Sequence, residues 1–275
     1  MLKEQFIMER RYLKNVSAKT VAWYEHSFKA FEGALDNRTT MVARITELRQ
    51  RGVAAVSVNT YLRCINAYFR WLHEEHKHEL LRLPKLKEEQ KVLATFSPQH
   101  VTALTHHRPK GRNAVRAWMI SLVMLDCGLR ASEALGLRRQ DLDFENLVVR
   151  VHGKGNKERL LPMSIELRKH LLRYTRERDG YIFSTRTGTV VTVRNFQRDL
   201  NELCQRLGIS GVRTSPHTLR HTFAAGYLRN GGNLYYLSKI LGHTSVKTTE
   251  RYLQSLGIED LKAVHERFSL LAAGR

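Results

Sequence analysis

A charged, proline-containing segment at residues 82–91 (RLPKLKEEQK) interrupts the apolar periodicity of the sequence. Before it, apolar residues recur every three or four positions, which predicts helices and no strands. After it, helical periodicity alternates with short stretches that favour strands. A proline followed by a run of charges ends an amphipathic helix and is typical of a boundary between domains. We therefore predict two domains, residues 1–88 and 97–275, with a linker over residues 89–96.

The residues before the linker predict a bundle of helices. Ser17 is a suitable N-cap for one helix, and Thr39 or Thr40 for the next. A third helix is expected to begin near Ser57. Its apolar side chains fall on one face, which needs a partner surface: Tyr61, Ile65, Tyr68, Phe69 and Leu72.

The residues after the linker predict helices around a small antiparallel sheet. Two stretches rich in β-formers, 147–152 and 158–162, are expected to form a hairpin with a basic, glycine-containing tip at 153–157 (GKGNK). The fold class is therefore mainly α with a small antiparallel β-sheet. Helices are expected near the following residues: 97–106, 113–127, 164–178, 193–207, 216–230, 233–241, 245–255 and 258–271.

Charge limits the kinds of partner this chain can have. Lys and Arg number 46 against 26 Asp and Glu, a net charge of +20. The excess positive charges repel one another unless a polyanion neutralises them, so nucleic acid is the expected partner. No window holds the roughly 18 apolar residues of a membrane span, and the N-terminus lacks a secretory apolar run, so we expect a cytoplasmic protein without a membrane partner. Its three cysteines are too widely spaced for a disulfide framework or a cysteine zinc cage.

Four segments after the linker concentrate residues that suit attack on a phosphodiester. The non-bridging oxygens gain charge in the transition state, and the guanidinium forks of Arg130 and Arg220 can stabilise that charge. Lys154 or His217 can protonate the leaving sugar oxygen. Tyr252 can capture the phosphate covalently if neighbouring groups activate its hydroxyl. The segments are 129–133 (LRASE), the hairpin tip, 217–221 (HTLRH) and 241–244 (LGHT).

In this order and with these surroundings, the residues resemble the active site of the tyrosine recombinases, the family of phage integrases, Cre and the Xer proteins. Segments 128–133, 153–159, 216–223 and 241–245 are most similar to Xer-like members. Segments 57–63 and 67–72 are similar to the family's core-binding domain. The resemblance implies a helical, SAM-like, DNA-binding core-binding domain and an α+β catalytic domain, with six catalytic residues: Arg130, Lys154, His217, Arg220, His243 and Tyr252.

The resemblance also implies a mechanism: a site-specific DNA recombinase that needs no metal and no cofactor. Tyr252 would form a 3′-phosphotyrosyl intermediate, and strand exchange would pass through a Holliday junction in integration, excision or resolution. Arg130 and Arg220 would hold the phosphate and Lys154 would protonate the leaving 5′-oxygen. The remaining roles are proton transfer at the tyrosine by His217, donation to the phosphate by His243, orientation of Arg130 or His217 by Glu133, and DNA contacts by Lys157 and Arg159.

The implied substrate is double-stranded DNA with paired half-sites, bound by a homotetramer that exchanges the C-terminal helix 258–271 in a bacterial, nucleoid-associated setting. Folding of that helix onto its own domain is the alternative. A partner recombinase or an accessory protein is left open. The rival functions are a type IB topoisomerase, which reseals the same strand, and a DNA-binding accessory protein that does not cut. His217 and His221 have the one-turn spacing of a zinc pair, but no third ligand follows at a matching place.

Overall fold

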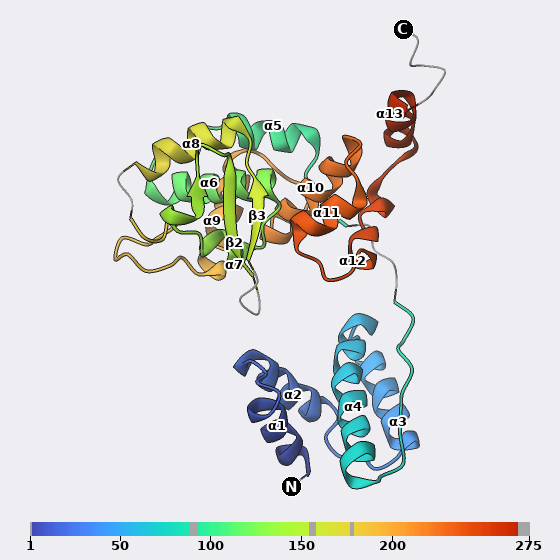
Figure 1. Cartoon of the computed structure of the whole chain (residues 1–275). Coiled ribbons are helices and arrows are strands. Elements are labelled where there is room, and N and C mark those ends of the chain that lie inside the picture. The colour runs from blue at the N-terminus through green and yellow to red at the C-terminus, as the bar shows by residue number, and fades with distance from the viewer. Residues whose placement is uncertain (1, 89–92, 154–157, 177–178, 269–275) are drawn as a thin grey trace. The chain divides into compact units, whose positions relative to one another are not determined.

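The computed structural model describes residues 2–88, 93–153, 158–176 and 179–268. The chain divides into two compact units, Met1–Lys91 and Val92–Arg275 (Figure 1). Each unit has its own hydrophobic core. None of the described helices combines the length and the apolar composition that a bilayer crossing requires.

The N-terminal unit is helical, as predicted. Its core is rich in aromatic side chains, and Phe6 stands edge-on to Tyr24, Phe28, Tyr68 and Trp71. Such edge-to-face pairs add to the stabilisation that apolar burial supplies. The described helices are α1 (Leu2–Tyr12), α2 (Ala18–Ala30), α3 (Arg38–Gln50) and α4 (Ala55–His76).

The helix caps of this unit match the predictions at one helix and differ at another. Ser17 caps α2, and its hydroxyl accepts a hydrogen bond from the N–H of Thr20. Asn37, not Thr39 or Thr40, caps α3. Its side chain accepts from the N–H of Thr40, whose hydroxyl accepts from the N–H of Asn37. This reciprocal capping box satisfies two N–H groups at once, whereas a threonine cap satisfies one.

Two asparagines of α4 bind the chain that follows this helix, and we call the pair the asparagine clasp. The amide of Asn66 donates to the carbonyl of Leu83 and accepts from its N–H, both at 2.9 Å. Asn59 does the same for Leu86 at 2.9 and 2.8 Å. The side-chain amides thus satisfy backbone groups that a neighbouring strand would otherwise pair. Part of the charged segment 82–91 therefore lies along the N-terminal unit.

The C-terminal unit packs helices around an antiparallel sheet in the order β1–β2–β3. The described helices are α5 (Pro98–His106), α6 (Arg112–Cys127), α7 (Ala131–Leu135), α8 (Ile165–Thr175), α9 (Val193–Arg206), α10 (Pro216–Arg229), α11 (Leu234–Leu241), α12 (Lys247–Glu250) and α13 (Ile258–Phe268). The 3-10 turns are η1 (Arg139–Asp141) and η2 (Leu253–Ser255), and the strands are β1 (Leu142–Asp143), β2 (Val148–His152) and β3 (Glu158–Pro162).

The predicted hairpin is confirmed, since β2 and β3 pair antiparallel with Val149 opposite Leu161. The short edge strand β1 was not predicted, because two residues carry no readable alternation. The mainly α fold class with a small antiparallel sheet is confirmed. The hairpin tip, with Lys154 and Lys157, lies outside the described residues.

Helix α6 is the centre of this unit and contacts α5, α7, α8, α9 and α10. It ends at Cys127 and is followed by the C-cap Gly128, whose φ of +64° is in the left-handed region. A Cβ at this position would lie 2.3 Å from the ring of Phe223 on α10. Both the backbone conformation and the close approach therefore require glycine. The turn at Gly128 places Arg130 at the start of α7.

Candidate active site

The site begins at the N-terminus of α7, where Arg130 and Glu133 hold each other. The carboxylate of Glu133 accepts from the backbone N–H of Arg130 and from its Nη1, each at 2.8 Å. The first contact is a helix cap and the second is an ion pair one turn apart. The side chain of Arg130 keeps 40% of its surface exposed, while that of Glu133 keeps 6%. Arg130 is therefore the exposed partner of a buried carboxylate.

Glu133 is shared with a second arginine, Arg159 on β3. The guanidinium of Arg159 donates to both carboxylate oxygens at 3.1 and 2.8 Å, and its Nε donates to the carbonyl of Ile240. A third cation, Arg220, lies 3.9 Å from the same carboxylate. Burial alone would raise the pKa of Glu133, but hydrogen bonds from Arg159 and Arg130 outweigh it and lower the pKa to about 2. The carboxylate stays ionised at neutral pH.

Arg220 on α10 joins three segments from the interior of the site. Its guanidinium donates to the carbonyls of Gly128 and Leu241, at 2.8 and 2.7 Å, and to Nε2 of His243 at 3.2 Å. Burial and the charge of Arg130 lower the pKa of Arg220 to about 10, so it remains a cation at neutral pH. Its own contacts fix the position of this charge.

His243 follows the C-terminus of α11 and is held from both sides. An arginine N–H can only donate, so Nε2 of His243 accepts from Arg220 and Nδ1 carries the hydrogen. Nδ1 therefore donates to the hydroxyl of Thr249 at 2.8 Å. Burial and the charges of Arg220 and Arg130 lower the pKa of His243 to about 4. The imidazole is neutral at physiological pH.

Tyr252 lies just after α12 and points into this cluster. It is 2% exposed. Its hydroxyl oxygen lies 3.1 Å from Nδ1 of His221, and the two ring centroids are 5.5 Å apart. Burial raises the pKa of Tyr252 above its ordinary value of 10, although the charges of Arg220 and Arg251 oppose the shift. In this structure Tyr252 is a neutral phenol held beside cations.

Comparison with known proteins identifies the family of this chain. Residues 91–257, more than half of the chain, match the profile of the phage integrase family. The chain belongs to the phage integrase family. Relatives include a tyrosine recombinase XerC of Syntrophus aciditrophicus, 26% identical over 97% of this chain and 88% of the relative. A tyrosine recombinase XerA of Pyrococcus furiosus is 28% identical over 94% and 91%.

Solved structures of integrases and recombinases share the fold. The integrase of transposon Tn1549, solved with transposon right end DNA, aligns with a TM-score of 0.78 at 19% identity over 98% of this chain and 99% of the integrase. XerH bound to palindromic difH substrate aligns at 0.72 and 17% identity over 98% and 83%. The predicted family, enzyme class and fold class, a Xer-like tyrosine recombinase of mainly α structure, are confirmed.

Most of the site residues predicted for this integrase-family protein meet in the cluster. The structure brings together Arg130, Glu133, Arg220, His243 and Tyr252. His217 lies at its edge: its side chain is exposed, and its ring faces that of His221 with centroids 6.2 Å apart. The positions of Lys154 and Lys157 are outside the described residues.

Two contacts of the site did not emerge from the sequence. Arg159 was predicted to touch DNA, but its guanidinium lies on Glu133 and Ile240 and is 16% exposed. His221 is not among the predicted site residues, but its Nδ1 lies 3.1 Å from the hydroxyl oxygen of Tyr252. Among the described residues, no three His, Cys, Asp or Glu side chains gather as a metal site would require.

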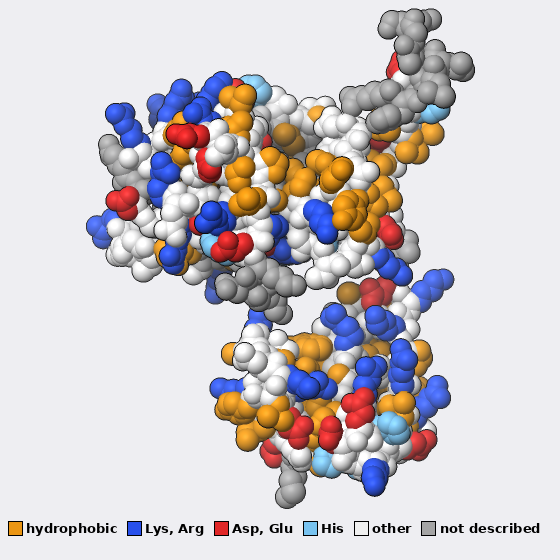
Figure 2. Space-filling view, viewed as in Figure 1, with side chains coloured by type: hydrophobic (Ala, Val, Ile, Leu, Met, Phe, Trp, Pro, Cys, Tyr) orange, Lys and Arg blue, Asp and Glu red, His pale blue; other side chains and the backbone are white. Residues whose placement is uncertain are grey.

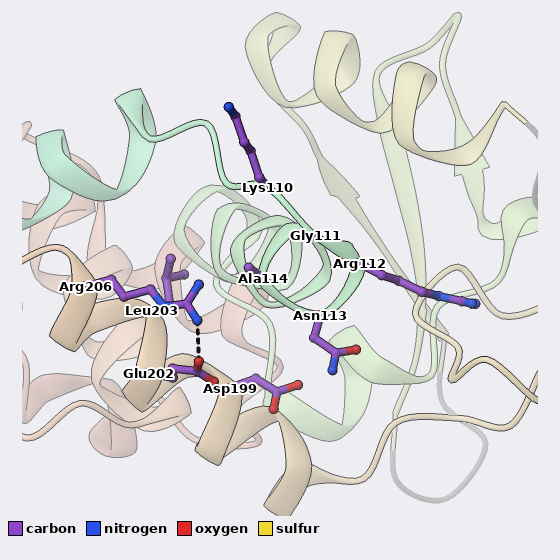
Figure 3. Close-up of a pocket in the computed structure, with 9 residues that line it drawn as sticks. All are labelled: Lys110, Gly111, Arg112, Asn113, Ala114, Asp199, Glu202, Leu203 and Arg206. Atoms are coloured by element: carbon purple, nitrogen blue, oxygen red, sulfur yellow. Dashed lines mark hydrogen bonds and ion pairs between the residues drawn. The ribbon is translucent and has the colours of Figure 1, made fainter.

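A pocket of about 360 Å³ lies between the start of α6 and the side of α9 (Figure 3). It combines basic residues with Asp199 and Glu202, and Glu202 pairs with Arg206. None of the predicted site residues of this integrase-family protein is among the residues that line it: Lys110, Gly111, Arg112, Asn113, Ala114, Asp199, Glu202, Leu203 and Arg206. The reacting groups therefore lie in the arginine cluster and not in this pocket.

Proposed function

We propose that this Xer-like recombinase cleaves and rejoins DNA at specific sites, with Tyr252 as the nucleophile. The observation that carries the proposal is the position of the Tyr252 hydroxyl, against His221 and close to Arg220. Arg220 in turn lies beside Glu133 and His243. A nucleophile and fixed cations at one place are what phosphoryl transfer requires.

In the proposed reaction, the Tyr252 oxygen forms a bond to the scissile phosphorus while the bond from phosphorus to the 5′-oxygen breaks. Arg130, the more exposed arginine, and Arg220 stabilise the charge on the non-bridging oxygens. Lys154 gives a proton to the leaving 5′-oxygen, and His217 assists proton transfer at the tyrosine. The 3′-phosphotyrosyl bond conserves energy, and the free 5′-hydroxyl attacks the partner strand to build a Holliday junction. His243 donates to the phosphate, which requires its imidazole hydrogen on Nε2, whereas in the DNA-free structure Nε2 accepts from Arg220 and Nδ1 donates to Thr249.

Double-stranded DNA is the proposed substrate. The net charge of +20 supports it, and Figure 2 shows Lys and Arg side chains over the visible face of each unit, interspersed with Asp and Glu. The relatives solved with DNA support it as well. Lys157 and Arg159 remain predicted DNA contacts, and Arg159 would have to share its guanidinium with Glu133. We propose that residues 1–88 bind the core of the site and residues 97–275 cut, and that the enzyme acts in the cytoplasm at the nucleoid.

The proposed active form is a homotetramer on paired half-sites that exchanges its C-terminal helix. Ile258 and Leu261 on α13 support this, because they are 65% and 53% exposed and form one apolar face. The contact between Arg229 of α10 and Asp260, at 3.4 Å, supports the alternative in which α13 folds back on its own unit. The side chain of Phe268 and all of Leu271, which the predicted face also includes, lie outside the described residues.

The test is covalent capture of a nicked duplex that carries one half-site pair, in the presence of EDTA. The parent protein is expected to form an adduct that survives denaturant, and Tyr252→Phe is expected to form none. Tyr236→Phe is the matched control, because Tyr236 is 62% exposed on α11 and lies outside the cluster. Adduct formation by Tyr252→Phe, or a requirement for a divalent metal, would refute the proposal.

A second assay separates recombination from topoisomerase action. A plasmid with two sites is expected to yield exchanged products, whereas a type IB topoisomerase relaxes supercoils and yields none. Relaxation without any recombinant product would favour the topoisomerase. Binding of DNA without an adduct would favour a non-cleaving accessory protein.

A further inference from the structure

The Tyr252 hydroxyl has neighbours of two chemical kinds. Arg220 approaches it with N–H groups, which can donate hydrogen bonds but cannot accept them. His221 approaches with Nδ1, 3.1 Å from the hydroxyl oxygen, and a neutral imidazole nitrogen can accept. A phenol has only one hydrogen to give. When the imidazole hydrogen of His221 lies on Nε2, the phenolic hydrogen points at Nδ1 of His221 and lone pairs of the oxygen lie on the side of Arg220.

Packing holds both rings in this relation. Tyr252 is 2% exposed, and its ring lies at 56° to that of His221. On its other side, His221 faces His217, one turn earlier on α10, at an angle of 24°. The backbone N–H of Tyr252 donates to the carbonyl of Thr249, whose hydroxyl is bound to His243. The hydroxyl of Tyr252 thus contacts His221 because packing fixes the Tyr252 ring and hydrogen bonds fix the residues just before it.

The proton stays on the tyrosine in this contact. Burial and the charge of Arg251 lower the pKa of His221 to about 4, while burial raises the pKa of Tyr252 above 10. Transfer of the phenolic proton to the imidazole is therefore strongly unfavourable, because the neutral imidazole is a much weaker base than the phenolate. In the DNA-free protein His221 is therefore a hydrogen-bond acceptor for the phenol, and the phenolic proton leaves only during attack on the phosphate, with the assistance proposed above for His217.

We propose that His221 is a positioning residue for the nucleophile. Its Nδ1 accepts the phenolic hydrogen of Tyr252 and thereby turns the oxygen lone pairs toward Arg220, where the scissile phosphate is to be held. The hydrogen of the imidazole then lies on Nε2. This inference rests on the proposed role of Tyr252 and adds the group that orients its reacting oxygen.

The test compares two variants of His221 in single-turnover cleavage of the nicked duplex at saturating enzyme. His221→Phe keeps a ring in place and removes the acceptor, whereas His221→Asn puts an amide oxygen near the position of Nδ1. We expect His221→Phe to slow cleavage by about 10- to 100-fold, because misdirection of a reacting atom costs that much, with DNA affinity within about twofold of the parent. His221→Asn is expected to recover most of the rate. His106→Phe, the same exchange at an exposed histidine of α5, is the matched control.

Nitrogen-15 NMR of the DNA-free protein gives a second readout that does not depend on cleavage. The parent is expected to show His221 with its hydrogen on Nε2. Tyr252→Phe removes the donor that stabilises the neutral imidazole, so the pKa of His221 is expected to rise. If the parent forms no adduct with DNA, the proposed function fails, and this measurement alone decides the role of His221. A hydrogen on Nδ1, parental cleavage by His221→Phe, or equal loss in the Phe and Asn variants would overturn the inference.

Discussion

At the scale of single residues, the carboxylate of Glu133 is the group that fixes several arginines of the site at once. It caps α7 through the N–H of Arg130, pairs with the Arg130 side chain, and binds Arg159 with both oxygens. The family resemblance predicted that Glu133 orients Arg130 or His217, and in the structure Glu133 binds Arg130. The link to Arg159 was out of reach, because it depends on how β3 packs beside α7.

We predict that Glu133→Gln lowers the free energy of unfolding at pH 7 by about 3 kcal/mol, the equivalent of a pKa lowered from 4.5 to about 2. The folded pKa lies below the unfolded one, so this stabilisation is fully present above about pH 4.5 and is lost as the pH falls through 2. Urea denaturation at pH 7 and below pH 4.5 measures the free energy of unfolding of parent and variant. The gap between these two free energies is expected to narrow at the lower pH. Glu166→Gln, at a carboxylate 74% exposed on α8, should change little at either pH. A gap that widens in acid would contradict the assignment.

The residues of the site differ in how well the sequence predicted them. Arg130, Arg220, His243 and Tyr252 stand in short ordered motifs, and the structure brings them into one cluster. His221 stands in the same motif as Arg220, but its partner lies 31 positions later on another element. No local spacing encodes such a contact, because it arises only when α10 and the segment after α12 pack together.

At the scale of elements, α6 and α9 are joined by a buried ion pair as well as by apolar packing. Arg116 and Asp199 are 3.1 Å apart, with side chains 8% and 7% exposed. Arg116 also donates to the carbonyl of Ser184. Charges so far from water are tolerated only when each partner compensates the other.

Removal of one charged side chain of this ion pair is therefore expected to lower the free energy of unfolding more than removal of both. Asp199→Ala should lower the free energy of unfolding by about 3–5 kcal/mol, because it leaves the Arg116 guanidinium buried without its carboxylate. The double variant Arg116→Met with Asp199→Leu should lose much less. Chemical denaturation of the two proteins gives the comparison, and a double variant that is less stable than Asp199→Ala would show the pair to be worth more than apolar packing.

The elements were more predictable than their ends and their attachments. The periodicity located α2, α4 and the β2–β3 hairpin, because each has a long enough pattern, and Ser17 was correctly predicted as the cap of α2, whereas α4 begins two residues before the predicted Ser57. The cap of α3 fell on Asn37 since a reciprocal box outcompetes a single hydroxyl. The asparagine clasp was not predicted, because the polar Asn59 and Asn66 of an otherwise amphipathic helix give no sign that they bind backbone at Leu83 and Leu86.

At the scale of the whole molecule, the excess of basic residues is the property the sequence states most directly. With a net charge of +20 on 275 residues, binding of DNA phosphates by Lys and Arg is expected to release counterions from the DNA, and this release contributes to affinity. The charge does not identify the target sequence, since base readout depends on which side chains enter a groove.

DNA affinity is expected to fall about 10³-fold or more between 50 and 200 mM salt, the behaviour of proteins that neutralise about six or more phosphates. Fluorescence anisotropy with a labelled duplex across this range measures the slope. A random duplex of the same length is the comparison, and its slope should be similarly steep. An affinity that is flat across this range would contradict binding through the phosphate backbone.

The grouping of Arg130, Arg159 and Arg220 around the single carboxylate of Glu133 has an electrostatic consequence for the timing of the reaction. Three cations against one anion leave the cluster with a surplus of two positive charges. A phosphodiester at rest brings one negative charge, and the five-coordinate phosphorane formed during attack brings two. The negative charge on the substrate therefore equals the surplus positive charge of the cluster only when the phosphorane forms. The arrangement thus stabilises the reacting phosphorus more than it stabilises intact DNA.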